Sequence, residues 1–245
     1  MKTIVHEIPY SPASNLDEEI FTASSVFFDI ETTGFSPAHT SLYLIGCAYH
    51  IEQMLYIKQF FAETPEEEKE VLEQFLLLLD GFDTIITFNG IGFDIPYLKA
   101  KCNTYECNEH FADFTYVDIF KSISQIKHIL QLPNYKQKTI EAFLGIGRND
   151  LYSGGELIEI YHSYTKEPRP DKLEILLLHN YEDVLDMPAL LPVLSYVHLF
   201  YVQYLSCSAS VSEYTDYKQQ EKKELILSIA VSYTHLRAHE TTLHL

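Results

Sequence analysis

Three apolar segments, rich in β-branched and aromatic residues, follow one another early in the chain at 25–30, 42–51 and 54–61. Each has the length and composition of a β-strand. Beyond them the pattern alternates between short strands and helices, and it then becomes helical. Because strands come first and helices follow, the sequence predicts an α/β domain in which a mixed sheet is flanked by helices.

The remaining elements are predicted from caps and periodicity. Thr64 followed by Pro65 and Glu67 predicts a helix that begins with a capping box, and Gly81 marks its end. Short strands are expected at 84–88 and 116–119, and helices are expected from the turn before Pro96 and at 138–144, 155–164 and 173–191.

Composition excludes several classes of protein. The chain has 35 acidic and 17 basic residues, a formal net charge of −18, which excludes a broadly basic nucleic-acid coat. Its hydrophobic fraction of 47% predicts a folded core. Four cysteines in 245 residues do not indicate a disulfide framework, and the first residues lack the apolar run of a signal peptide. We therefore expect a cytoplasmic protein.

The chain is expected to divide into four parts. These are an N-terminal extension (1–22), the α/β domain (23–195), a helical extension (196–230) and a tail (231–245) that resembles a translated sequencing adapter. We do not count the tail histidines as metal ligands. The stretch 187–212 contains no charged residue, but its prolines and polar side chains favour a buried helix and connector over a membrane span.

Paired carboxylates end the first strand of the domain. Asp29 and Glu31 are two positions apart, so both side chains point to the same face of the sheet. Like charges this close repel unless a cation or a proton separates them. A solvated strand exit is the alternative interpretation, because a DxE pattern has many accidental matches.

Two further motifs carry acids. Asp94 follows a strand and the Gly90 to Gly92 turn, where a helix cap is the simpler role. His179 and Asp183 are four residues apart on a predicted helix and share a face, whereas Tyr181 is turned away. Asp118 is interpreted as the cap of the next helix.

Together these motifs resemble the DEDD 3′-5′ exonucleases of the ribonuclease-H-like superfamily, and more closely the YprB-like branch. The match rests on FDIETTG, YLIG, FNGIGFDIPYL, LGIGRND and HNYEDVL in this order. The resemblance implies a five-stranded mixed sheet flanked by helices, metal-binding acids at Asp29, Glu31, Asp94 and Asp183, and hydrolysis of phosphodiester bonds. The third motif departs from the family, because tyrosine-type enzymes place Tyr four residues before the last Asp and histidine-type enzymes place His five before it. Here His179 stands four before Asp183.

Hydrolysis of this kind uses two divalent cations, which activate water and stabilise the leaving oxygen. Carboxylate ligands without cysteine suit Mg²⁺ or Mn²⁺. We expect His179 to act as general base, because its ordinary pKa lies near neutrality and that of tyrosine near 10.

The expected partner is single-stranded DNA or RNA, held at its end. Between 121 and 148 the chain has five basic residues and one acid. Such a cluster is often only a solvated surface. The expected nucleic-acid contacts are Thr32, Asn89, Phe93, Lys136, Lys138 and Arg148. The sequence gives no oligomeric state.

Three alternatives remain from the sequence. The first is a module with the same fold that binds nucleic acid or a protein without cleaving it. The second is a phosphatase of the haloacid dehalogenase type, suggested by DIETTG alone; it leaves Asp94 and Asp183 unexplained. The third is a zinc site at Cys102, Cys107 and His110, for which no fourth ligand follows at a usual spacing.

Overall fold

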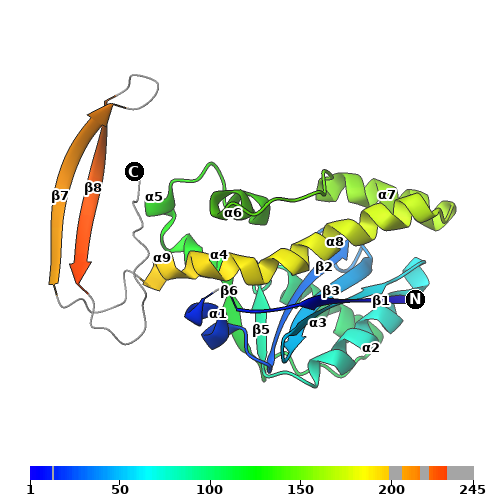
Figure 1. Cartoon of the computed structure of the whole chain (residues 1–245). Coiled ribbons are helices and arrows are strands. Elements are labelled where there is room, and N and C mark those ends of the chain that lie inside the picture. The colour runs from blue at the N-terminus through cyan, green and yellow to red at the C-terminus, as the bar shows by residue number, and fades with distance from the viewer. Residues whose placement is uncertain (13, 199–205, 216–220, 231–245) are drawn as a thin grey trace.

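The computed structural model describes residues 1–12, 14–198, 206–215 and 221–230 of the chain. Its centre is a mixed sheet of six strands in the order β1-β4-β3-β2-β5-β6 (Figure 1). The strands are β1 (Lys2–Pro9), β2 (Ser25–Thr32), β3 (Leu42–Ile51), β4 (Met54–Phe61), β5 (Thr84–Thr87) and β6 (Thr115–Asp118). The first four pair antiparallel, and β5 and β6 continue the sheet parallel to β2. The predicted α/β class is confirmed.

The sheet has one strand more than the five predicted. Residues assigned to an N-terminal extension form the edge strand β1, which pairs with β4 along its whole length from Lys2↔Phe61 to Pro9↔Met54. An edge strand is bonded on one side only and remains half exposed. Its sequence KTIVHEIP therefore lacks the continuous apolar run that marks the central strands.

Helices cover both faces of the sheet. On one face lie α2 (Glu68–Leu79) and α3 (Asp94–Tyr105), where Phe75 packs on Phe28 of β2. The long helix α8 (Pro170–Leu190) crosses the other face (Figure 1). Around α8 lie α1 (Asn15–Ile20), α4 (Ile119–Ser124), α5 (Lys127–Leu130), α6 (Gln137–Leu144), α7 (Gly154–Lys166), η2 (Leu191–Val193) and α9 (Leu194–His198). The predicted helices are thus present with small shifts of their ends.

The start of α2 differs in detail from the prediction. A short 3-10 turn, η1 (Pro65–Glu67), precedes the helix, and Thr64 makes no side-chain cap. The Glu67 carboxylate instead accepts from the Glu63 backbone N–H at 2.7 Å and pairs with the amino group of Met1 at 2.6 Å. The predicted capping box at Thr64 is therefore wrong, because the Thr64 side chain does not cap the helix start.

The described residues after α9 form strands and not the predicted helical extension. β7 (Ser206–Thr215) and β8 (Glu221–Ala230) pair antiparallel as a two-stranded sheet. Serines occupy every second position from 206 to 212, and this alternation is typical of a strand. The absence of charged residues in 187–212 favoured a buried helix instead, and the strand pattern was therefore missed. The tail 231–245 lies outside the described residues. Within the described chain, no helix is both long and apolar enough to cross a membrane.

Candidate active site

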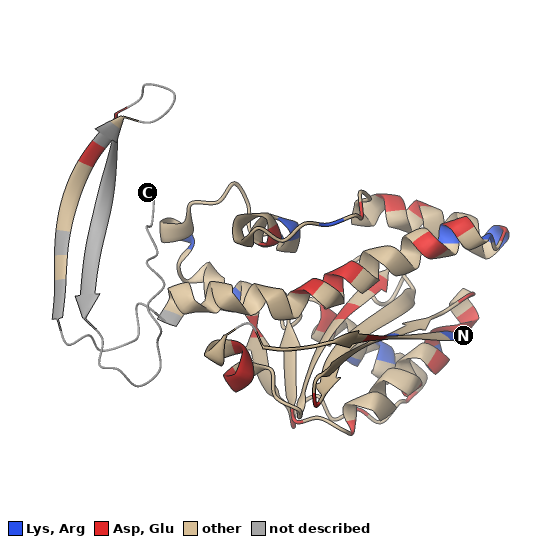
Figure 2. Cartoon of the chain, in the orientation of Figure 1, with Lys and Arg blue, Asp and Glu red and all other residues tan. Residues whose placement is uncertain are grey.

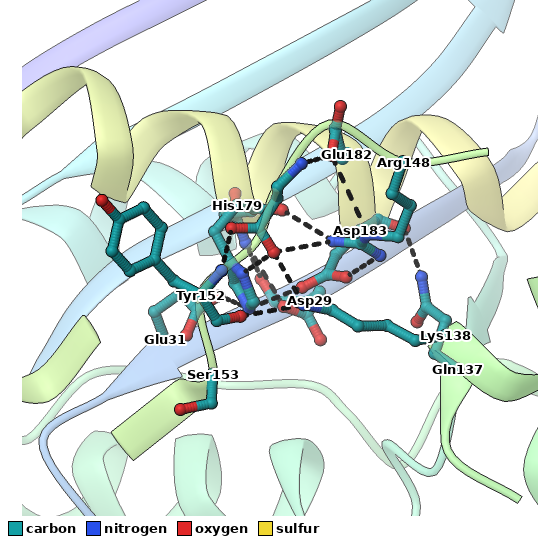
Figure 3. A network of polar contacts seen from close by, with 12 residues as sticks. Asp29, Glu31, Gln137, Lys138, Arg148, Tyr152, Ser153, His179, Glu182 and Asp183 are labelled. Atoms are coloured by element: carbon teal, nitrogen blue, oxygen red, sulfur yellow. Dashed lines mark hydrogen bonds and ion pairs between the residues drawn. The ribbon is translucent and has the colours of Figure 1, made fainter. Parts of the chain in front are cut away.

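Strand β2 delivers the first two acids to the face that α8 covers. Phe28 and Ile30 point into the core shared with α2, so Asp29 and Glu31 point to the opposite side. Both carboxylates are half-buried, and both lie beneath α8 in Figure 3. The expected shared orientation of the DxE pair is confirmed.

Asp94 joins the site through an unpaired stretch of backbone. β5 pairs with β2 only from Ser25 to Phe27, so the backbone N–H of Ile30 has no strand partner on that side. The Asp94 carboxylate accepts from this N–H at 3.3 Å. Asp94 is the first residue of α3, directly after the N-cap residue Phe93, and is 6% exposed. Its bond to Ile30 thus ties the start of α3 to β2.

Helix α8 brings the third motif over these acids. His179 Nε2 lies 3.3 Å from Asp183 Oδ2 and 3.6 Å from Glu31 Oε1. Tyr181 points elsewhere, with its ring 4.8 Å from that of His6 on β1. The prediction that His179 shares a face with Asp183 while Tyr181 does not is confirmed, because α8 is regular through both positions.

A buried amide ties α8 to the sheet at the same level. Asn180 donates to the Asp29 carboxylate at 3.3 Å, and its own oxygen accepts from Gln59 at 3.0 Å. Gly46 stands opposite Asp29 on β3, and a Cβ there would lie 2.0 Å from the Asn180 oxygen. The glycine of the YLIG motif is therefore required by the close approach of this helix.

We expect Gly46→Ala to lower the free energy of unfolding by about 1–3 kcal/mol, the usual range for overpacking. The added methyl must displace Asn180 or the backbone of β3. Urea unfolding of the two proteins measures the change. Gly81→Ala is the matched control, because its Cβ meets only ordinary contact at 3.6 Å. Equal stability of the Gly46 variant and the wild type would contradict the packing described above.

Burial and mutual repulsion raise the pKa values of the acids. Burial is the larger cause for Asp29, and the charges of Asp183, Asp94 and Glu31 add to it, so its pKa lies well above the ordinary value. The pKa of Glu31 is raised for the same reasons, with Arg148 acting in the opposite direction. Burial raises the pKa of Asp94 to about 7. Three carboxyls therefore favour a proton or a cation at the site.

Residues 145–153 connect α6 to α7 and contact α8 at the site. We call this connector the strap. Arg148 of the strap donates to Asp183 at 2.6 Å and to Glu141 at 3.0 Å. Asp150 Oδ2 lies 2.6 Å from His179 Nδ1. Glu182 holds the strap itself by accepting from its backbone at 149 and 150. The strap thus contacts both His179 and Asp183 of α8.

Among the described residues, one group of three or more metal-ligating side chains has its ligand atoms within 4.8 Å of one another. It consists of Glu31, His179 and Asp183. The possible zinc ligands Cys102, Cys107 and His110 do not form such a group, and the two cysteines are free. His110 instead stacks on Phe114, with ring centroids 5.2 Å apart.

The expected nucleic-acid contacts have different surroundings. Lys136 is exposed, and Lys138 pairs with Asp150 at 2.7 Å while 43% of its side chain remains exposed. Arg148 is 7% exposed and paired with acids, so the structure places it inside the site rather than on a contact surface. Figure 2 shows acidic segments along α8 and basic ones near α5, α6 and the strap.

The other three expected contacts lie at the end of β2 and in the turn between β5 and α3. Thr32 bonds the carbonyl of Gly34 at 2.9 Å, and Asn89 is exposed with a left-handed φ of 68°. Phe93 is half-buried, and its ring lies 5.9 Å from that of Phe35, which is 90% exposed. Phe35 was not predicted from the sequence, although it directly follows the FDIETTG motif.

The sequence also did not predict roles for Asp150, Asn180 and Glu182. Asp150 closes the LGIGRND motif, and the other two lie within HNYEDVL. Their presence in motifs was the available signal, but their partners are 29 to 151 residues away in the chain. Asp118, in contrast, caps α4 as predicted by accepting from the Lys121 N–H at 2.9 Å.

Several known proteins are similar to this chain in part. A DNA polymerase of Methanocaldococcus jannaschii is 42% identical over 43 residues, which are 18% of this chain and 3% of that protein. The family B DNA polymerase from Pyrobaculum calidifontis is similar in structure with a TM-score of 0.57 and 18% identity, over 70% of this chain and 24% of the polymerase. This likeness shows a shared fold.

A zinc-bound complex of E. coli ExoI with single-stranded DNA has a TM-score of 0.41 and 14% identity, over 67% of this chain and 45% of that protein. The chain thus spans less than half the length of each of these relatives. A family model described as the RNase H superfamily matches residues 26–195. These residues run from the second residue of β2 to beyond the end of α8 and make up more than half of the chain, which therefore belongs to the RNase H superfamily.

Proposed function

We propose that this protein is a metal-dependent 3′-5′ exonuclease of the DEDD type that hydrolyses phosphodiester bonds at single-stranded DNA or RNA ends. The observation that carries the proposal is the convergence of Asp29, Glu31 and Asp94 with Asp183 and His179 of helix α8. The raised pKa values of three of these carboxyls support it, because a fold gains nothing from burying like charges together without a cation.

The donor set fits hard divalent cations. Carboxylate oxygens from β2, α3 and α8 are the ligands that Mg²⁺ and Mn²⁺ prefer. Two such ions would be held by the four acids and would supply an activated water and charge stabilisation at the leaving oxygen. The chain's own contribution is to fix the acids, and to place His179 Nε2 beside Glu31 and Asp183 where it can accept a proton from the attacking water.

Substrate contacts follow from the positions around the site. Thr32 at the end of β2, and Asn89 and Phe93 between β5 and α3, lie next to Glu31 and Asp94 in the chain, and Lys136 and Lys138 offer exposed positive charge. A few phosphate contacts of this kind suit a short single-stranded end, and an aromatic ring accepts any base. In this proposal Arg148 holds Asp183 and does not contact substrate.

The test uses 5′-labelled single-stranded DNA and RNA with Mn²⁺, Mg²⁺ or EDTA. We expect a ladder that shortens from the 3′ end with metal and no cleavage in EDTA. The double variant Asp29→Asn/Asp183→Asn is the matched control and should be inactive while still folded. A circular single strand should stay intact, and its cleavage would indicate an endonuclease. Binding without cleavage under every metal would favour the alternative, a module that retains the fold but has lost activity.

A further inference from the structure

The Asp150 side chain is the most deeply buried acid that touches His179. It is 1% exposed, and its Oδ2 lies 2.6 Å from His179 Nδ1. The same oxygen accepts from Lys138 at 2.7 Å, and Arg148 lies 3.7 Å from it. Its other oxygen accepts from the Tyr152 N–H at 3.0 Å. Three donors besides the imidazole therefore surround this carboxylate.

We propose that Asp150 is a positioning residue, which fixes neutral His179 in the tautomer with its proton on Nδ1 and its lone pair on Nε2. A carboxylate can only accept, so the ring nitrogen that faces it must carry the hydrogen. The opposite nitrogen is then free to accept a proton. The inference rests on the proposed function, in which Nε2 receives the proton of the attacking water.

The opposing influence comes from the other side of the ring. Glu31 and Asp183 also offer carboxylate oxygens to Nε2, and they would favour a proton there. Their distances are 3.6 Å and 3.3 Å, compared with 2.6 Å at Nδ1. N–H···O hydrogen bonds in proteins reach about 3.2 Å, so the contact with Asp150 is the one of hydrogen-bond length, and it decides the tautomer.

The strap holds Asp150 in place independently of the imidazole. Glu182 accepts from the backbone N–H of Asp150 at 2.8 Å and from the Asn149 side chain at 2.9 Å. Because Glu182 and His179 belong to the same helix, the carboxylate and the ring keep one geometry. A group whose partner orients it in this way needs no rearrangement before it accepts a proton.

The experiment reads the tautomer directly, without activity. Histidine is labelled with ¹⁵N in the metal-free protein, and long-range ¹H–¹⁵N spectra are recorded at a pH where the rings are neutral. The spectrum of His179→Gln identifies the signal. We expect a protonated Nδ1 in the wild type. In Asp150→Ala the proton should move to Nε2, since Glu31 and Asp183 are then the remaining carboxylates beside the ring.

Turnover of Asp150→Ala should fall by roughly 10²-fold, while the stabilisation by Mn²⁺ is retained. Glu68→Gln is the control, because Glu68 is a buried acid paired with Lys101 at 2.7 Å in another part of the fold. In this variant the His179 ring should have the same tautomer as in the wild type. If the alanine variant does not fold, Asp150→Leu fills the volume without an acceptor.

A wild-type proton on Nε2, or an unchanged tautomer in the Asp150 variants, would overturn the proposal. The tautomer is measured in the metal-free protein, so it stands or falls separately from the nuclease activity. If the tautomer is as expected and no nucleic acid is cleaved, the proposed function fails and the role of Asp150 in orienting the ring remains. If nucleic acid is cleaved but the His179 proton lies on Nε2, the proposed function stands and the role of Asp150 fails.

Discussion

His179→Ala is expected to lower turnover by about 10²- to 10⁴-fold, the range for loss of a general base. The remaining carboxylates still hold metal, so the rise in melting temperature with Mn²⁺ should persist. The measurement is single-turnover cleavage of a labelled single strand at saturating Mn²⁺. Circular dichroism of the same samples confirms that the variant is folded.

Tyr181→Phe is the control for this result. Tyr181 lies on the same helix two residues away, but its ring packs against His6 and makes no contact with the acids. Its turnover should equal that of the wild type. A greater loss in Tyr181→Phe than in His179→Ala would overturn the role of His179, and it would mean that α8 shifts or breaks before Asp183 when substrate binds.

Asp94→Asn is expected to stabilise the metal-free protein and to abolish its stabilisation by divalent metal. The amide keeps an oxygen for the Ile30 N–H but removes a buried charge. In the wild type, millimolar Mn²⁺ should raise the melting temperature by mass action. Thermal unfolding with and without Mn²⁺ measures both effects. Glu68→Gln is the control and should keep the wild-type metal response.

The pH dependence of stability has a definite sign for this site. Burial raises the pKa of Asp94 from 3.8 to about 7 in the folded protein, so the folded state binds the proton more tightly than the unfolded state. The stabilising contribution is complete below about pH 4 and is lost as pH rises to about 7. Complete loss of this contribution lowers the free energy of unfolding by about 4 kcal/mol.

We therefore expect the metal-free wild type to lose stability between about pH 4 and pH 7, and Asp94→Asn to lose less. Urea unfolding across this interval, with EDTA present, measures the difference. Identical pH profiles for the two proteins would show that Asp94 does not carry a raised pKa. A metal response that is equal in both would contradict the placement of Asp94 in the metal site.

The features that could be predicted from the sequence are those that depend on neighbouring residues. A strand alternates its side chains, so Asp29 and Glu31 had to share a face, and a helix repeats every 3.6 residues, so His179 and Asp183 had to do the same. Both expectations hold in the structure. The central strands and most of the helices were predictable for the same reason, because their apolar patterns are local.

Other features depended on partners far along the chain. Residues 2–9 are a strand because β4 offers an unpaired edge to them, and nothing in their own sequence requires it. The role of Arg148 also depends on distant partners. From its charge alone, it was predicted to contact nucleic acid. Burial beside Glu141 and Asp183 makes it part of the site instead.

The contacts between the motifs depend on how distant parts of the chain pack together. Asp94 enters the site because β5 is too short to pair with Ile30, and Asp150 reaches His179 because Glu182 fastens the strap to α8. These contacts are set by where packed elements end and cross. Local sequence fixes which face a side chain occupies, whereas its partner across the fold is fixed by the burial of the whole core.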